Sequence, residues 1–205
     1  DKNVTTKLIM NNLDLVILAG GKGSRIKKFL KNKPKPMAKF NNKYFIEYII
    51  QNFSKYDFRK IYILAGYKSK IIINKFHKKI FNFVEVICLK EKNLMGTGGA
   101  LNVLKKEKIN DFILVNGDTI FDINLNLLLN TIKNNQVGSI ALIKNSSKKN
   151  YKLNKLSINK NKIINETKGN LKNAGVYFFK KKILNFINNK VSSLENDILP
   201  KLIKK

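Results

Sequence analysis

The sequence predicts an α/β fold in which a mostly parallel mixed sheet is flanked by helices, and three observations predict it. Apolar runs with strand character alternate along the first 143 residues with segments whose apolar residues recur at helical spacing. Short glycine clusters follow three of the expected strands. Hydrophobic residues make up 43% of the 205 residues, enough for one domain with a sizeable core.

The first expected strand, residues 13–19, is a short apolar run that ends in glycines, as a buried central strand does. Residues 45–53 carry apolar residues at helical spacing, and residues 60–65 form the next strand. The same alternation continues, with helices expected at 69–81, 98–104 and 125–135 and strands at 84–89, 112–116 and 139–143. Such alternation is typical of a Rossmann-like sheet with helices on both faces.

The pattern changes after about residue 144, where the chain becomes rich in lysine and asparagine. Two weak strands are expected at 155–158 and 162–165, joined by a turn, and a clear strand at 174–179. Two helices, at 183–188 and 194–203, close the chain. We find no internal repeat or linker and therefore expect a single domain over residues 10–205.

The net charge of +28 suggests a nucleic-acid-binding protein, but the composition weakens that interpretation. Of the 41 Lys plus Arg residues only Arg25 and Arg59 are arginine, and the lysines are scattered along the whole chain. Lys, Asn, Ile and Phe all have A/T-rich codons, so genome composition alone would raise them together. We therefore expect no specific nucleic-acid partner, and binding of nucleic acid stays open only as an alternative motivated by charge.

The single cysteine and the single histidine exclude an internal disulfide and a zinc site built from these residue types. Cys88 lies in an apolar run, so we expect it in the core, and we expect His77 at the surface. No stretch approaches the ~20 apolar residues of a membrane span, and the first residues contain no signal-peptide core. We expect a soluble, reduced, cytoplasmic protein without a membrane partner, and the sequence leaves a homo-oligomer open.

The glycines and prolines indicate a site, because residues that the composition disfavours mark special backbone geometry. Three glycine clusters follow strands of the expected sheet: Gly20, Gly21 and Gly23; Gly96, Gly98 and Gly99; and Gly117 before Asp118. In open α/β sheets ligands bind at the carboxyl ends of the strands, so all three clusters should meet at one edge.

The first glycine loop and the Pro-Lys-Pro segment after it have the chemistry of a polyphosphate site. The loop fits neither the Walker pattern nor the dinucleotide fingerprint, but its backbone N–H groups can reach phosphate oxygens. Arg25 adds a planar fork for phosphate, and Lys35 adds a second cation held between Pro34 and Pro36.

With these motifs the chain resembles the sugar-1-phosphate nucleotidyltransferases, or nucleotide-sugar pyrophosphorylases, from about residue 13 to residue 203. The signature of that family is Leu-Ala-Gly-Gly-x-Gly-Ser/Thr-Arg followed by Pro-Lys-Pro, which this chain carries at 18–25 and 34–36. The runs Met-Gly-Thr-Gly-Gly-Ala-Leu at 95–101 and Val-Asn-Gly-Asp-Thr at 115–119 look most like the bacterial D-glycero-D-manno-heptose 1-phosphate guanylyltransferases. The resemblance implies a nucleotidyltransferase sheet similar to that of glycosyltransferase-A proteins.

The resemblance implies a role for each matching residue. The residues implied in nucleotide binding are Ala19, Gly20, Gly21, Gly23, Ser24, Arg25, Gly96, Thr97 and Gly117. Those implied in sugar binding are Asn116, Glu166, Lys168, Asn173 and Gly175. The implied catalytic residues are Arg25, Lys35 and Asp118, with Asp118 as the ligand of Mg²⁺, a hard ion that accepts one or two carboxylates plus phosphate oxygens. Glu91 stands where relatives often carry a glutamate, and we assign it no role.

The reaction implied is attack by the oxygen of a sugar 1-phosphate on the α-phosphorus of a nucleoside triphosphate, with pyrophosphate leaving. GTP and D-glycero-D-manno-heptose 1-phosphate are the implied substrates, giving a nucleotide sugar for surface polysaccharide synthesis. The nucleophile is already an anion, so alignment and charge neutralisation carry catalysis and no general base is required. The alternatives are another base or sugar (mannose, glucose or amino-sugar 1-phosphate) and a catalytically weak binding or regulatory paralog.

The division of the expected domain follows from the same resemblance, with a nucleotide-binding half at 10–143 and a sugar-binding half at 144–205. Relatives continue to a Phe-x-Asp-x-Gly-x-Pro segment, whose aspartate is a second metal ligand, and this chain stops at Lys205 without it. We therefore expect either a fragment of a longer protein or a site that lacks one ligand.

Overall fold

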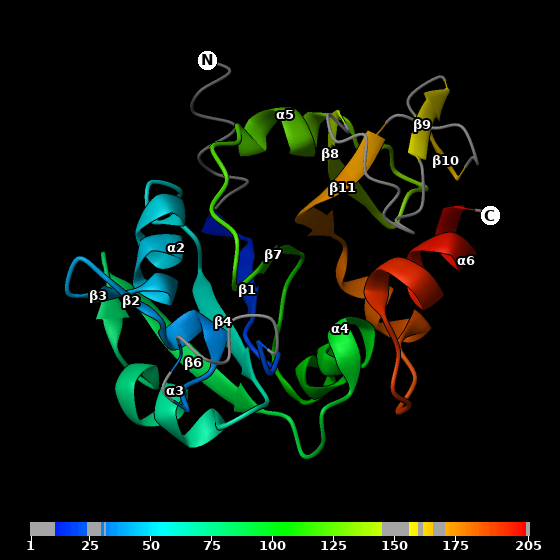
Figure 1. Cartoon of the computed structure of the whole chain (residues 1–205). Coiled ribbons are helices and arrows are strands. Elements are labelled where there is room, and N and C mark those ends of the chain that lie inside the picture. Colours follow the sequence, from blue (N-terminus) through cyan, green and yellow to red (C-terminus); the bar gives the residue numbers. More distant parts are fainter. Residues whose placement is uncertain are drawn as a thin grey trace.

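The computed structural model describes residues 11–23, 30, 32–144, 156–159, 162–165 and 171–203. In this part of the chain the main feature is a nine-stranded mixed sheet with the order β10-β9-β11-β7-β1-β4-β6-β5, in which β8 also pairs with β11 (Figure 1). Its strands are β1 (Asp14–Leu18), β4 (Lys60–Ala65), β5 (Ile80–Phe81), β6 (Val84–Lys90), β7 (Phe112–Asn116), β8 (Gly138–Lys144), β9 (Leu156–Asn159), β10 (Lys162–Asn165) and β11 (Leu171–Phe179).

Parallel strands form the centre of this sheet and antiparallel strands extend it. β1 pairs in parallel with β4 on one side and with β7 on the other, and β4 pairs in parallel with β6. β11 runs antiparallel to both β7 and β8, and the β9–β10 hairpin lies beyond it. The apolar sequence of β1 suits this central position, because strands flank it on both sides and helices cover it on both faces of the sheet. The predicted α/β class with a mixed sheet is confirmed.

Helices cover both faces of the sheet, and the hydrophobic core divides accordingly. The helical segments are η2 (Lys35–Met37), α2 (Phe45–Phe53), α3 (Ser69–Phe76), α4 (Gly96–Gly99), η3 (Ala100–Lys106), α5 (Leu125–Asn130), η4 (Lys181–Phe186), η5 (Leu194–Ile198) and α6 (Leu199–Ile203). Leu15 and Ile17 point to the face covered by α2, α3 and α5, whereas Val16 between them points to the face covered by η3, η4 and α6. A short hairpin of β2 (Lys39–Phe40) and β3 (Lys43–Tyr44) stands apart from the main sheet.

Several predicted elements have their expected bounds, and others are shorter or wound differently. The helix expected at 69–81 ends at Phe76, because Lys78 takes a positive φ of 60° and Ile80–Phe81 turns back as β5 against β6. The helix expected at 125–135 ends at Asn130, where two turns replace its last part. The segment expected as helix at 98–104 begins at Gly96 and becomes a 3₁₀ helix from Ala100.

The expectations for the two unusual side chains are confirmed. Cys88 is buried in the core, and burial raises its thiol pKa to about 12. His77 is exposed, and its Nδ1 accepts a hydrogen bond of 3.1 Å from the backbone N of Cys88. Within the described ranges, no helix is long and apolar enough to cross a membrane.

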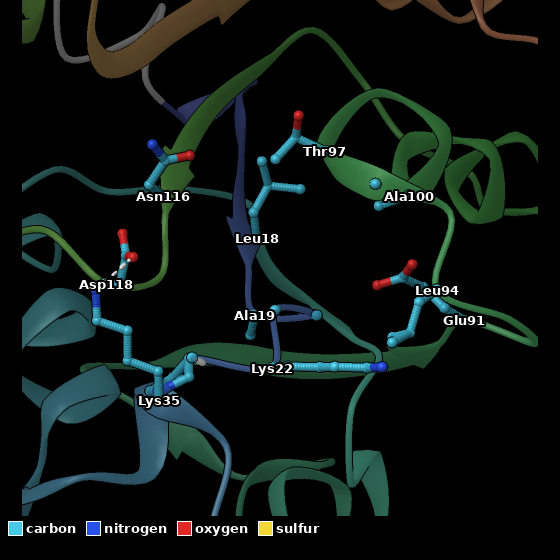
Figure 2. Close-up of a pocket in the computed structure, with 15 residues that line it drawn as sticks. Leu18, Ala19, Lys22, Lys35, Glu91, Leu94, Thr97, Ala100, Asn116 and Asp118 are labelled. Carbon is cyan, nitrogen blue, oxygen red and sulfur yellow. Dashed lines mark hydrogen bonds and ion pairs between the residues drawn. The ribbon is translucent and has the colours of Figure 1, made fainter. Parts of the chain in front are cut away.

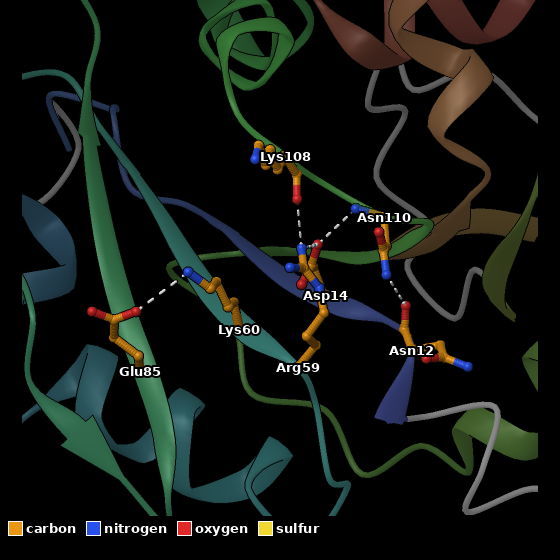
Figure 3. Close-up of polar contacts among 7 residues, drawn as sticks. All are labelled: Asn12, Asp14, Arg59, Lys60, Glu85, Lys108 and Asn110. Atoms are coloured by element: carbon orange, nitrogen blue, oxygen red, sulfur yellow. Dashed lines mark hydrogen bonds and ion pairs between the residues drawn. The ribbon is translucent and has the colours of Figure 1, made fainter.

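A partly buried ion pair closes the end of the sheet at which β1 begins (Figure 3). Asp14, the first residue of β1, has an exposed fraction of 0%, and its Oδ2 accepts hydrogen bonds from Arg59 Nη2 at 2.6 Å and from Asn110 N at 2.8 Å. Arg59 also donates to the carbonyl oxygen of Lys108 at 2.7 Å. One of the two arginines therefore ties β1, β4 and the segment before β7 together, at the edge opposite the carboxyl end of β1.

Candidate active site

A pocket of about 530 Å³ opens where β1, β6 and β7 end, at the edge at which the glycine clusters were expected to meet. Figure 2 shows the side chains that point into it. Nine of the sequence-predicted residues line this pocket: Ala19, Gly20, Gly21, Gly23, Lys35, Gly96, Thr97, Asn116 and Asp118. Segments up to 100 positions apart in the chain therefore meet at one place, as the topology of a parallel sheet dictates.

The glycine loop after β1 needs its glycines for two different reasons. Gly23 has a φ of +62°, and a Cβ there would lie 2.9 Å from the Cβ of Lys35. At Gly21 a Cβ would meet nothing within 4 Å, so the backbone of this residue faces open space. The loop is thus packed at Gly23 against the Pro-Lys-Pro segment and open at Gly21 towards the pocket.

The end of β7 approaches the end of β1 closely, and this contact directs the next residue into the pocket. Gly117 N donates a 2.8 Å hydrogen bond to the carbonyl oxygen of Leu18, and a Cβ on Gly117 would lie 2.5 Å from that oxygen. Gly117 itself does not line the pocket, whereas Asp118 beside it does. The glycine therefore acts here through close backbone packing.

Lys35 and Asp118 form an ion pair inside the pocket, with 2.7 Å between Nζ and Oδ2 (Figure 2). Lys35 lies in η2, whose buried Pro36 and Met37 fix the segment against the core. The two side chains are 36% and 42% exposed, so solvent and ligands can reach both. Thr119 Oγ1 donates to Asp118 Oδ1 at 3.1 Å, which leaves lone pairs on both carboxylate oxygens.

The second wall of the pocket is the short helix α4. Gly96 has a φ of +75°, and a Cβ there would come within 2.5 Å of the carbonyl oxygen of Ser192. Gly98 N donates a 2.9 Å hydrogen bond to the same oxygen, so the glycines of this motif pack α4 against the segment before η5. Thr97 follows Gly96 and lines the pocket.

Glu91 is a pocket residue to which the sequence alone assigns no role. Its exposed fraction is 5%, and burial raises the pKa of its carboxyl group, while a 3.2 Å hydrogen bond from Met95 N to Oε2 opposes the shift. The other oxygen, Oε1, lies so near the glycine loop that a Cβ on Gly20 would be 2.1 Å from it. A glutamate immediately after a buried strand and before a glycine cluster is the signal that could have identified it.

The predicted sugar-binding residues of β11 lie behind the pocket wall. Gly175, with a φ of +79°, packs against Asn116: a Cβ on Gly175 would lie 2.5 Å from Asn116 Nδ2. Asn173 Oδ1 accepts a 2.8 Å hydrogen bond from Gly175 N. Four further candidates, Ser24, Arg25, Glu166 and Lys168, lie outside the residues that the structure describes.

The charged side chains on the described lining of the pocket are two cations, Lys22 and Lys35, and two carboxylates, Glu91 and Asp118. Lysine and backbone amides suit phosphate groups, and an accessible carboxylate suits a hard divalent cation. Among the described residues no group of three His, Cys, Asp or Glu side chains could hold a metal by itself.

Comparisons with known proteins cover most of the chain. A model described as "Nucleotidyl transferase" matches residues 15–205. The chain is 36% identical over 116 residues to the D-glycero-alpha-D-manno-heptose 1-phosphate guanylyltransferase of Campylobacter jejuni, a match covering 57% of this chain and 52% of that protein. It is 33% identical over 194 residues to the bifunctional protein GlmU of Methanococcus maripaludis, covering 91% of this chain and 44% of that protein. The chain thus spans about half the length of the curated relatives it matches.

A solved structure has the same architecture. The crystal structure of HddC from Yersinia pseudotuberculosis complexed with GMP-PN matches with a TM-score of 0.72 and 27% sequence identity. The match covers 92% of this chain and 86% of that chain.

Proposed function

Because this chain belongs to the nucleotidyl transferase family, as its motifs predicted, we propose that it transfers a nucleoside monophosphate from a nucleoside triphosphate to a sugar 1-phosphate. The observation that carries this proposal is the convergence of the glycine loop, Lys35 and Asp118 on one pocket at the carboxyl ends of the central strands. A loop of exposed backbone amides, a lysine and a carboxylate are the groups that a reaction between two phosphate compounds requires.

In the proposed reaction an oxygen of the sugar 1-phosphate attacks the α-phosphorus of the triphosphate. A bond forms between that oxygen and the α-phosphorus, the bond from the α-phosphorus to the bridging oxygen of the β-phosphate breaks, and pyrophosphate leaves with the electron pair. The attacking phosphate is an anion and needs no deprotonation. The protein has to align two anions that repel each other, and Lys35 offsets part of their charge.

The described residues fit a site for Mg²⁺ held by one protein carboxylate. Asp118 lines the pocket, presents oxygen ligands and is 42% exposed, which matches the preference of Mg²⁺ for one or two carboxylates plus substrate phosphates and water. When bound there, the ion would neutralise negative charge on the phosphates. Lys35 already pairs with Asp118, so it is placed to contact the same phosphate groups.

Guanine is the base that we propose, and the position of Glu91 supports it. Its carboxylate is buried beside Gly20, and Met95 N is its donor among the described residues, so acceptor capacity remains on both oxygens. Guanine presents two adjacent donors, N1–H and the N2 amino group, to such a carboxylate. Uracil and thymine present one N–H between two carbonyl oxygens, which a carboxylate repels. The names of the Campylobacter and Yersinia relatives agree with a guanine nucleotide.

For the acceptor we propose D-glycero-D-manno-heptose 1-phosphate. Support comes from the printed name of the Campylobacter protein and from the order of motifs that this chain shares with such enzymes. In Figure 2 Asn116, at the end of β7, lies on the far side of the pocket from Glu91, and Asn173 and Gly175 of β11 lie behind Asn116; we propose that the acceptor is held at Asn116.

The test is pyrophosphate release from each nucleoside triphosphate with a panel of sugar 1-phosphates and Mg²⁺. We expect the highest kcat/KM with GTP and the heptose compound. Turnover with another pair would replace the substrate assignment and keep the reaction, whereas nucleotide binding without turnover for any pair would favour a binding or regulatory role. Glu91→Gln should reduce the preference for GTP at least tenfold, because one oxygen becomes an amino group. Glu85→Gln, near the amino end of the strand that Glu91 follows, is the matched control.

A further inference from the structure

A half-buried carboxylate, that of Glu195, connects the pocket wall formed by α4 with the strand β11. Glu195 lies in η5 and does not line the pocket, yet its Oε2 accepts hydrogen bonds from Thr97 Oγ1 at 2.8 Å and from Ser193 Oγ at 3.0 Å. Thr97 Oγ1 in turn accepts a 2.8 Å hydrogen bond from Leu194 N. In Figure 2 the Thr97 hydroxyl points away from Leu18, another residue that lines the pocket. The hydrogen bonds to Glu195 and from Leu194 N therefore hold Thr97 from the side away from Leu18.

The other oxygen of the Glu195 carboxylate binds β11, the strand behind Asn116. Glu195 Oε1 accepts a 3.1 Å hydrogen bond from the hydroxyl of Tyr177, a fully buried residue of β11. Burial, together with the charge of Glu195, raises the pKa of the Tyr177 phenol. The phenol therefore stays protonated at neutral pH and is the donor in this bond.

From Tyr177 the contacts lead back to the pocket. The Tyr177 hydroxyl accepts a hydrogen bond from Asn173 Nδ2, and Asn173 Oδ1 accepts one from Gly175 N. Both ends of the Asn173 amide are thereby fixed. Gly175 packs against the side chain of Asn116, which lines the pocket. A continuous set of contacts thus joins Thr97 on α4 to Asn116 on β7 through Glu195.

We propose that Glu195 is a positioning residue that sets the distance between two sides of the pocket, the side at Thr97 that would bind the nucleotide and the side at Asn116 that would bind the sugar. This role rests on the proposed function. In-line attack requires the two bound phosphates to be aligned, and a displacement of about 1 Å can reduce the rate about a hundredfold. Only a carboxylate can serve here, since all three neighbouring hydroxyls donate to it. A glutamine would place an amino group against one of these donors.

The test compares Glu195→Gln and Tyr177→Phe with wild type. We expect kcat at saturating concentrations of both substrates to fall at least tenfold, while the Kd of GTP alone and of the sugar 1-phosphate alone stays within about threefold. The double variant should lose little more than the more affected single variant, because both changes break the same connection. Asp197→Asn is the matched control, since this exposed η5 carboxylate accepts a hydrogen bond from Ser193 N and has no part in the path.

Three results would overturn the proposal. Unchanged kcat in both variants would do so, as would a fall in kcat matched by an equal loss of GTP binding. A third result would show a purely structural role for Glu195. In that case the activity of each variant would fall in proportion to its fraction of folded protein, and Asp197→Asn would lose as much activity when its melting temperature falls equally. If the wild-type protein turns over no substrate pair, the proposed function fails; if it does and the variants equal it, only the role of Glu195 fails.

Discussion

Lys35 Nζ lies 2.7 Å from Asp118 Oδ2, although the two residues are 83 positions apart in the sequence. Both side chains are more than a third exposed, so the ion pair itself stabilises the fold by at most ~1 kcal/mol. The pair therefore places an ammonium group and a carboxylate in the pocket while contributing little to the stability of the fold. Substitutions at either position should change activity and leave stability nearly unchanged.

The first prediction concerns the metal. Asp118→Asn keeps the shape of the side chain and removes the charge that would attract Mg²⁺, so kcat should fall about a hundredfold or more and should recover little at high Mg²⁺. Initial rates of pyrophosphate release over a Mg²⁺ titration measure this. Asp122→Asn, at an exposed carboxylate outside the pocket, should behave as wild type. Near-normal turnover in Asp118→Asn would exclude the proposed metal role.

The second prediction concerns charge neutralisation. Lys35→Ala should lower kcat/KM about a hundredfold while the melting temperature changes by no more than a few degrees, because the lost ion pair is solvent-exposed. Lys33→Ala removes an exposed lysine just before the same segment and should leave kcat/KM unchanged. If both variants lost activity equally, overall positive charge rather than the position of Lys35 would be responsible.

The third prediction separates glycines needed for packing from glycines needed for the ligand. Gly96→Ala places a side chain at a residue with a φ of +75°, where its Cβ would lie 2.5 Å from a backbone oxygen. The free energy of unfolding should therefore fall by about 1–3 kcal/mol. Gly21→Ala meets nothing within 4 Å and should leave the melting temperature unchanged. Its methyl group would nevertheless protrude towards the ligand and raise the KM for the nucleotide. Urea unfolding and nucleotide KM values for both variants provide the comparison.

Much of the fold could be predicted from the sequence because local patterns carried the information. The strands at 60–65 and 112–116 and the helix at 45–53 have their predicted bounds, since their apolar residues match the sheet or helix period. The helix expected at 69–81 was too long, because its apolar spacing continues to Ile80 although that residue pairs with β6. Periodicity does not detect such a turn.

The candidate site was predictable only in part, and for a physical reason. Glycine motifs and the residues next to them can be recognised from a short stretch of sequence, so nine pocket residues could be identified from the sequence. Glu195 contacts Thr97 across 98 positions, and nothing near Glu195 in the sequence indicates that contact. Glu91 depends on tertiary packing in the same way, since its burial beside Gly20 arises only when β1 and β6 end at the same edge.

The fourth prediction uses the buried thiol. Burial raises the pKa of Cys88 to about 12, from an ordinary value of 9.0, and only the thiolate reacts with alkylating or disulfide reagents. At pH 8 the native thiolate fraction should therefore be about a thousandfold lower than that of an ordinary thiol. Modification should be slow in buffer, fast in denaturant, and should accelerate in the native protein as pH rises. Fast modification of the native protein at pH 8 would contradict the burial of Cys88.

The fifth prediction compares two ion pairs at the amino ends of the strands (Figure 3). Arg59→Met leaves the fully buried carboxylate of Asp14 without its cation. Removing one partner of a buried pair typically costs about 3–5 kcal/mol, and because the Arg59 side chain is 30% exposed we expect a loss near the lower end. Lys60→Met breaks a 3.4 Å pair with Glu85 whose side chains are 37% and 41% exposed, so it should cost at most ~1 kcal/mol.

Chemical denaturation of both variants measures this difference, and the position of the pairs adds a second expectation. Asp14 begins β1, whereas the pocket lies where β1 ends, so both variants should keep the wild-type KM for nucleotide at temperatures where they are folded. Equal losses of stability in Arg59→Met and Lys60→Met would contradict the distinction between buried and exposed pairs. A changed KM in folded Arg59→Met would instead show that the central strand transmits a change at its first residue to the glycine loop at its end.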